Sequence, residues 1–202
     1  MIQGPKFKIC RRLGPGIHEK CQTQKFVLSE ARHAKTKRGK KPKQLSDFGL
    51  QLIEKQKIRF SYGVSEKQFY NYVKEAVDTK GASAAEMLYE KLEARLDNVV
   101  YRLGIAHTRP LARQIVAHGH ITVNGKRVTI PSLRVKAGDT ISIREGSRKS
   151  ALFTELGARL KNYSVPAWLT FNPEKIEAKI AGKPKNTEGF LNFNAVLEFY
   201  SR

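Results

Sequence analysis

The chain has 202 residues, with 38 Lys and Arg against 18 Asp and Glu, and a formal net charge of +20. This length is enough for one or two domains with a sizeable core. So large an excess of cations favours binding to a polyanion. No apolar run approaches the roughly 18 residues that a membrane-spanning helix needs, and the N-terminus lacks the apolar segment of a signal peptide. Composition therefore favours nucleic acid, and not a membrane, as the partner.

The first 43 residues are the most basic part of the chain. They carry 13 Lys and Arg and only two acids, Glu19 and Glu30. Residues 32–43 contain almost no apolar side chain, so we expect this run to be mobile in solution and to become ordered on a polyanion. A solvated tail or a localisation signal is the alternative.

Two cysteines, Cys10 and Cys21, are too few for a disulfide framework. A disulfide between them is possible, but a cytosolic pair would normally stay reduced. We therefore expect two small, partly buried thiols.

Helix signals begin at residue 45. Ser46 is placed to cap a first helix, and the spacing of Ser65 and Gln68 predicts a capping box for a second. Ser83 and Glu86 repeat that spacing before a third helix. Along this third helix an apolar stripe recurs every three or four residues, which predicts a core-facing surface. Its members are Leu88, Leu92, Leu96, Val99 and Leu103.

The most informative stretch is 108–128. It predicts a short basic helix that ends at Gly119 and continues into a hairpin turning on Asn124-Gly125. Arg109 and Arg113 are four residues apart and share one helical face. A rigid platform that presents cations, without a catalytic group, is typical of a nucleic-acid-binding module.

Further short strands are predicted after the hairpin. Residues 133–135 and 140–144 alternate apolar and polar side chains around a turn. Residues 108–144 therefore predict an α/β module with three or four strands. We expect a helix near 151–160, an irregular loop through 164–189 and an apolar ending at 195–200.

Candidate catalytic groups are few. His107, His118 and His120 cluster, but no carboxylate or cysteine at ligand spacing accompanies them. We interpret His118 and His120 as hydrogen-bond donors or stacking partners beside RNA, or as plain surface residues. Gly125-Lys126 lacks the Ser/Thr and the first glycine of a phosphate-binding loop.

Aromatic side chains lie among cations in the second helical region, a pattern that can stack on unpaired bases. Phe69 already belongs to a helical core stripe with Val73 and Ala76. Tyr70 falls off that stripe and remains a candidate for RNA contact.

The triplet Arg95-Leu96-Asp97 also occurs in pseudouridine synthases that carry a basic helix–hairpin module. In those enzymes the aspartate acts in a large catalytic domain that follows the module. Here only about 55 residues follow it, too few for such a domain. The sequence therefore predicts that the protein is not an enzyme.

From end to end the chain resembles the bacterial-type ribosomal protein S4 family of the small subunit. The blocks at 45–64 and at the C-terminus separate it from other proteins that carry the same RNA-binding module, namely RNA-modifying enzymes and free-standing regulatory or stress proteins. The residues that carry the resemblance are Gly4-Pro5-Lys6, 45–57 with Tyr62-Gly63-Val64, 95–104, 112–125, 166–169 and 198–202.

The resemblance implies a structural constituent of the small ribosomal subunit, cytoplasmic, that binds the 5′ domain of the small-subunit rRNA and nucleates assembly. It further implies contact with mRNA where mRNA enters the subunit, a role in translational accuracy, and contact with ribosomal protein five and other small-subunit proteins.

The fold that the resemblance implies is α+β, with a helical domain, an inserted α/β module of helices packed on a short antiparallel sheet, and a basic extended N-terminal arm. The implied divisions are an arm at 1–44, a helical domain at 45–94, the module at 95–157 and a segment at 158–202 that packs on the helical domain.

Many relatives hold zinc in the N-terminal segment with four cysteines. Here Phe7 and Phe26 occupy two of those positions, which leaves only Cys10 and Cys21. Two thiolates cannot complete a tetrahedral site. We therefore expect no zinc and no other cofactor, and instead an apolar contact among the two phenylalanines and the thiols.

The residues expected to contact nucleic acid fall into two groups. Lys40, Lys41 and Lys43 match the basic positions that help relatives to unwind incoming mRNA. The expected rRNA contacts are Arg11, Arg12, Lys55, Lys57, Arg59, Tyr70, Arg109, Arg113, His118, His120, Asn124, Lys126 and Arg127.

Overall fold

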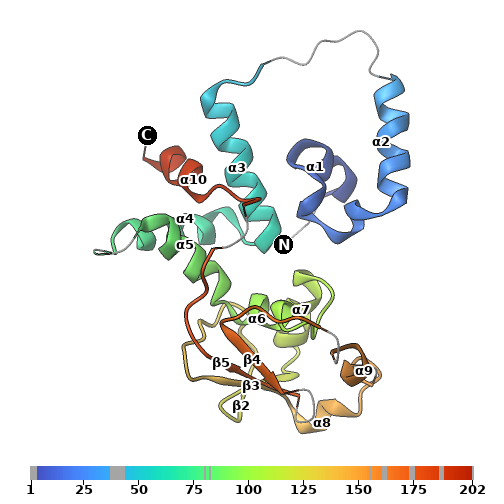
Figure 1. Ribbon diagram of the computed structural model, residues 1–202, viewed down its shortest axis with the longest axis vertical. Helices are drawn as coiled ribbons and strands as arrows, with labels where there is room; N and C mark the ends of the chain where they lie inside the picture. The colour runs from blue at the N-terminus through green and yellow to red at the C-terminus, as the bar shows by residue number, and fades with distance from the viewer. Residues whose placement is uncertain are drawn as a thin grey trace. The chain divides into compact units, whose positions relative to one another are not determined.

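The computed structural model describes residues 4–36, 44–79, 81, 83–154, 156–160, 163–172, 176–186 and 189–201. The chain divides into two compact units (Figure 1). The helical unit comprises Met1–Ala85 and Thr187–Arg202, and the sheet unit comprises Glu86–Asn186. The C-terminal segment therefore returns to the unit that the N-terminal segment builds.

The helical unit consists of five α-helices and two short 3-10 helices among its described residues. In chain order these are α1 (Lys6–Leu13), η1 (Pro15–Ile17), η2 (Glu19–Gln22), α2 (Gln24–Thr36), α3 (Asp47–Tyr62), α4 (Glu66–Val77) and α10 (Phe193–Tyr200). α10 lies against α3, 130 residues or more away along the chain (Figure 1).

Two of the three predicted serine caps, Ser46 and Ser65, are confirmed. The Ser46 hydroxyl accepts a hydrogen bond from the amide of Gly49, and the Ser65 hydroxyl accepts one from Gln68, each at 3.3 Å. These bonds satisfy amide groups that have no partner inside the helix. α3 ends at Gly63, whose φ of 62° closes the last turn in the left-handed conformation.

The N-terminal region is not the extended arm that was expected. α1 and α2 make it helical over much of 6–36. A small apolar cluster of Cys10, Leu13, Ile17, Cys21 and Phe26 explains the difference, because it lets the segment bury side chains of its own. Residues 37–43 lie outside the described part of the chain.

The sheet unit has helices and an antiparallel five-stranded sheet. Its helices are α5 (Ala84–Glu93, which begins in the helical unit), α6 (Leu96–Arg102), α7 (Arg109–Ala117), α8 (Glu145–Arg148) and α9 (Leu156–Leu160). Its strands are β1 (Ile121–Val123), β2 (Lys126–Val128), β3 (Thr140–Ile143), β4 (Leu169–Asn172) and β5 (Glu177–Ile180), in the order β2-β1-β3-β5-β4.

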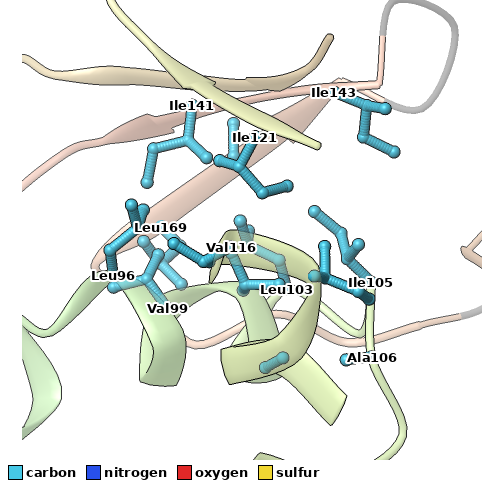
Figure 2. Packing of buried hydrophobic residues seen from close by; sticks show 14 of the residues in the cluster. Leu96, Val99, Leu103, Ile105, Ala106, Val116, Ile121, Ile141, Ile143 and Leu169 are labelled. Carbon is cyan, nitrogen blue, oxygen red and sulfur yellow. The ribbon is translucent and has the colours of Figure 1, made fainter. Parts of the chain in front are cut away.

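One face of this sheet packs on α6 and α7. Figure 2 shows Ile121, Ile141 and Ile143 of the strands facing Leu103 and Val116 of the two helices. The period-2 alternation of the strands brings the isoleucines to one face, while the helical stripe supplies the opposite side of the core. This core holds the α7–β1–β2 platform in place.

The apolar stripe is buried as predicted, but the single third helix is wrong. Chain direction changes between α5 and α6, where the Ala94 carbonyl accepts from Val135 and Leu96 donates to the Leu133 carbonyl. Arg95 is extended and forms an isolated β-bridge with Arg134. These long-range hydrogen bonds replace the helical ones at the break, and the expected strand at 133–135 is reduced to that bridge.

The predicted loop at 164–189 is also wrong in part, because β4 and β5 lie within it. β5 pairs with β3, for example Ile141 with Ala178, and β4 pairs with β5. Leu169, Ala178 and Ile180 join the sheet-unit core. The expected boundary, with all of 158–202 packed on the helical domain, is thus corrected: the segment is divided between the units near residue 186.

The predicted helix at 151–160 is confirmed only over its second half, as α9. None of the described helices is both long and apolar enough to cross a membrane.

Candidate nucleic-acid interface

The helix–hairpin platform has the predicted geometry. The Thr108 hydroxyl caps α7 by accepting from the amide of Leu111, and Gly119 ends the helix with φ of 73°. Asn124 and Gly125 both have positive φ, 50° and 77°, as a type I′ turn requires. The chain thus passes from α7 into the hairpin through two tight, defined turns.

Asn124 has a structural role within this turn. Its side-chain oxygen accepts from the amide of Thr140, and its Nδ2 donates to an Asp139 carboxylate oxygen, both at 2.8 Å. These bonds tie the hairpin tip to the start of β3. Asn124, an expected RNA contact, therefore fixes the position of the hairpin tip that carries Lys126 and Arg127.

Arg113 of α7 is held by a buried carboxylate. Its Nη2 and Nε donate to Asp97 Oδ2 at 2.7 and 2.9 Å. Asp97 also accepts two hydrogen bonds from Arg95, which is 2% exposed. Because one carboxylate faces two guanidinium groups, the trio keeps a net charge of +1, and Arg113 presents its cation from a fixed position.

Arg109 is fixed through a second buried acid. Glu93, which is fully buried, accepts from Arg102 and from the Asn98 amide. The side-chain oxygen of Asn98, Oδ1, in turn accepts a hydrogen bond from Arg109 Nε at 2.8 Å. The Arg109 guanidinium also lies over the Tyr101 ring at 4.4 Å.

We call these residues the carboxylate network: Glu93, Arg95, Asp97, Asn98, Arg102, Arg109 and Arg113. The sequence reading missed the acids and Asn98, because it treated Asp97 only as a possible catalytic residue. The available signal was polar residues directly beside the apolar stripe, at Glu93 and Asp97, in a segment rich in arginine. A charge next to a core position needs a buried partner.

Two further cations extend the platform along β2. Lys126 and Arg127 are exposed, and Lys126 makes no ion pair with any residue that the structure describes. Arg127 donates to the His118 carbonyl oxygen at 3.3 Å and lies directly over Gly119, where a Cβ would overlap its guanidinium. Gly119 is therefore needed both for the positive φ of the turn and for the space that the Arg127 guanidinium occupies.

The two histidines are placed differently. His118 is exposed beside the platform, whereas His120 is half-buried, with Nδ1 at 2.9 Å from the Ser147 hydroxyl and its ring edge-on to Phe153. Among the described residues no group of three His, Cys, Asp or Glu side chains that could hold a metal ion gathers there. His118 remains a candidate RNA contact, and His120 has a packing role.

In the helical unit the cations expected to contact RNA differ in their exposure to solvent. Lys55 is only 7% exposed; it donates to Glu66 at 2.6 Å and lies over the Phe199 ring at 4.5 Å. Its placement inside the α3–α10 packing corrects its assignment as a surface contact. The apolar stem and aromatic partners compensate the burial of the ammonium group.

The remaining cations of this unit are nearer the surface. Arg12 is exposed, Arg59 is half-buried beside Gln56 and Glu66, and Lys57 pairs with Glu54. Arg11 donates to the Ser29 hydroxyl at 2.7 Å, joining α1 to α2.

Tyr70 is 50% exposed, as expected for a residue off the core stripe, while Phe69 is fully buried. The Tyr70 ring lies 5.6 Å from the Tyr200 ring.

Tyr200 donates a hydrogen bond to Glu66 Oε1 at 2.7 Å. Burial of Tyr200 and, second to it, this hydrogen bond raise the Tyr200 pKa. Burial alone would raise the pKa of Glu66, but the hydrogen bonds from Lys55 and Tyr200 outweigh it and lower that pKa.

Two protein-family models match residues 1–141 of the chain, and known relatives match nearly all of it. Residues 1–93 match the ribosomal protein S4/S9 N-terminal domain, and residues 94–141 match the S4 domain. Small ribosomal subunit protein uS4 of Geobacillus kaustophilus is 46% identical over 202 residues, 98% of each chain. The uS4 protein of Roseiflexus castenholzii is 44% identical over 98% of each chain, and uS4A of Alkaliphilus oremlandii 44% over 96%.

The chain belongs to the ribosomal protein S4 family. The resemblance stated from the sequence is confirmed, and so is the expectation that the protein is not an enzyme, because its relatives are ribosomal proteins. The matched S4 domain ends within β3, so β4 and β5 lie beyond it although they complete the same sheet.

The N-terminal segment of this S4-family protein contains the expected apolar contact. The rings of Phe7 and Phe26 meet edge to face at 5.3 Å, beside Cys10 and Cys21. The cysteines are joined in a disulfide, so the expected pair of free thiols is wrong. The donor set offers two sulfur atoms and two phenylalanine rings, which does not fit a zinc ion.

Proposed function

We propose that this protein is a structural constituent of the small ribosomal subunit, that it binds the 5′ domain of the small-subunit rRNA early in assembly, and that its cellular location is the cytoplasm. The supporting observation is the cationic platform of α7 and β2. Arg113 is held by the buried carboxylate of Asp97 and Arg109 by the buried amide of Asn98, and Lys126 and Arg127 extend from the hairpin. A positioned array of cations recognises the phosphates of a folded RNA by shape.

Phosphate contacts release counterions, so affinity should depend steeply on salt. If 8 Lys and Arg contact phosphates, log K against log salt would have a slope on the order of −6 to −7. A filter-binding titration of a 5′-domain rRNA fragment at several salt concentrations measures this slope. A slope near zero would contradict the proposal.

A free-standing regulatory RNA-binding protein is the competing function. Co-sedimentation with small ribosomal subunits at moderate salt distinguishes the two. A ribosomal constituent is recovered at about one copy per subunit, while a regulator remains in the supernatant.

We further propose that the protein contacts ribosomal protein five, and the support is an acidic pocket between α3 and α10. This pocket has a volume of about 360 Å³ and its polar lining includes Asp47, Gln51, Glu54 and Glu198. Gln51 Nε2 donates to Glu198, while Gln51 Oε1 and Glu54 Oε2 are buried without a partner among the described residues. Unpaired buried acceptors in a protein of charge +20 are suited to a cationic side chain of a neighbouring protein.

The test is binding of isolated protein five to the wild type and to Glu198→Gln. Because Glu198 is exposed, we expect its replacement by a neutral amide to weaken the complex mainly at low salt, where an exposed charge pair is least screened. Unchanged binding would remove this partner from the proposal.

The role at the site where mRNA enters, and in accuracy, rests on Lys40, Lys41 and Lys43, which lie outside the described residues. Replacing all three with glutamine should slow translation of messages with structured coding regions and leave unstructured ones unchanged.

The absence of bound zinc is likewise a proposal. Metal analysis of the purified protein should find no stoichiometric zinc, and one equivalent per chain would contradict it.

A further inference from the structure

A second pocket of the helical unit lies between α1 and α3, and its lining includes two of the expected rRNA contacts, Arg12 and Arg59. It has a volume of about 450 Å³, within the range of small-ligand sites. Its lining combines an apolar interior with cations and contains no carboxylate. The lining residues are Pro5, Lys8, Ile9, Arg12, Leu13, Leu52, Gln56, Arg59 and Phe60.

The spacing of residues in the sequence explains which side chains line the pocket. On α1 the adjacent residues Lys8 and Ile9 lie one turn before Arg12 and Leu13. On α3 the lining recurs at 52, 56 and 59–60, so each helix presents one face. Leu13 is buried at the base, whereas Ile9, Leu52 and Phe60 are half-buried. This interior disfavours a hydrated ion but accommodates a flat, weakly polar group.

The cations at this pocket call for an anion. Lys8 and Arg12 are exposed, and neither forms an ion pair with any described residue. Arg59 is a third cation at the pocket, with its guanidinium 4.6 Å from the Phe60 ring centroid, but its Nε also lies 3.4 Å from Glu66 Oε2. Lys8 and Arg12 are therefore the two cations left for an anion. An occupant must therefore be anionic at one end.

Gln56 adds a directed polar group. Its Oε1 accepts two hydrogen bonds from Arg59, at 3.0 and 2.8 Å. This leaves the amide nitrogen as a hydrogen-bond donor at the pocket wall. A planar edge with an acceptor atom is the group that this donor suits.

We infer that this cationic pocket receives one unstacked nucleotide of the bound RNA. The base lies against Leu52 and Phe60, its edge accepts from Gln56, and its phosphate faces Lys8 and Arg12. Base–aromatic stacking and phosphate neutralisation are the two interactions by which proteins hold single-stranded RNA. The inference rests on the proposed rRNA binding and names the nucleotide-binding part of that interface.

The test uses the full chain with a 5′-domain rRNA fragment and two footprints. Base-specific chemical probing reports an unstacked base, and hydroxyl-radical probing reports the backbone. Leu52→Trp fills the pocket without changing charge, and Val77→Trp adds an indole at an exposed position of α4 as the control.

In the wild type we expect at least one unpaired base to be protected. Leu52→Trp should restore its reactivity and weaken binding about 5- to 100-fold, the effect of losing one base–aromatic stack, while the backbone footprint of the platform persists. Val77→Trp should match the wild type. The pocket has no such role if Leu52→Trp binds normally and leaves every base as protected as before.

A charge variant makes the test independent of the folding of Leu52→Trp. Lys8→Gln/Arg12→Gln should expose the same base and make the salt slope shallower by about 1.4, for two phosphate contacts to single-stranded RNA. Lys67→Gln/Lys74→Gln removes two exposed charges from α4 and should leave that base protected. A base that stays protected in Lys8→Gln/Arg12→Gln overturns the inference, and absence of any backbone footprint with wild-type protein overturns the proposed function itself.

Discussion

At the scale of single residues, Asp97 is the group on which the cationic platform depends. It is buried, and it pairs with Arg95 and Arg113 at 2.7 Å each. We predict that Asp97→Asn lowers the free energy of unfolding by about 3–5 kcal/mol, because it leaves two guanidinium groups without their charge partner. Urea denaturation measures this.

Arg113→Gln is the matched control. Its side chain is 31% exposed, and Asp97 keeps Arg95 in that variant. The cost in stability should be clearly smaller, while RNA affinity falls. Equal stability losses in the two variants would show that Asp97 has no special structural role.

Glu66 should make stability depend on pH in the acid range. Its pKa in the folded protein is lowered, since the hydrogen bonds from Lys55 and Tyr200 outweigh the opposing effect of burial. A carboxyl group with a lowered folded pKa stabilises the protein above its unfolded value of 4.5, and this contribution is lost as pH falls through the folded value. We expect the unfolding free energy of Glu66→Gln to decline less than that of the wild type between pH 6 and the acid limit, measured by urea titrations. An identical decline in both would remove Glu66 as a cause.

At the scale of elements, the two turns of the platform have separate roles that matched substitutions distinguish. Gly119 and Gly125 have nearly the same positive φ, 73° and 77°, but only a Cβ at Gly119 would meet Arg127. Alanine at either position should cost about 1 kcal/mol or more through backbone strain. Only Gly119→Ala should also displace Arg127 and weaken RNA binding.

Thermal unfolding and RNA titration of both variants provide the measurement. Similar losses of stability with a loss of affinity confined to Gly119→Ala are expected. If both variants bound RNA equally well, the packing of the Arg127 guanidinium against Gly119 would have no part in binding.

At the scale of the whole molecule, the division near residue 186 determines which fragment can fold. Leu169, Ala178 and Ile180 complete the core of the sheet unit. We predict that a fragment of residues 86–186 folds alone, whereas 95–157, which lacks β4, β5 and Glu93, does not, because it leaves β3 unpaired at one edge and Arg102 without its acid. Circular dichroism and the dispersion of amide NMR signals distinguish the two, and a folded 95–157 fragment would contradict the prediction.

Local patterns in the sequence were sufficient for several parts of this protein. The caps at Ser46 and Ser65, the end of α7 at Gly119 and the Asn124-Gly125 turn were predicted because each depends on the conformational preference of one or two residues. The buried stripe was predicted because periodicity records burial directly. The basic composition likewise indicated a polyanionic partner.

Only the tertiary structure decided the features that depend on residues far apart in the chain. The predicted third helix breaks at Arg95 because Val135 and Leu133 form hydrogen bonds with Ala94 and Leu96 on either side of it, and β5 is a strand because β3 offers an unpaired edge. Lys55 is a core residue because Glu66 and the aromatic rings of α10 surround it. The sequence by itself determined the local elements and the charge of the partner. Burial and pairing at long range decided which cations remain at the surface and which acids hold them there, because these depend on neighbours that no local pattern records.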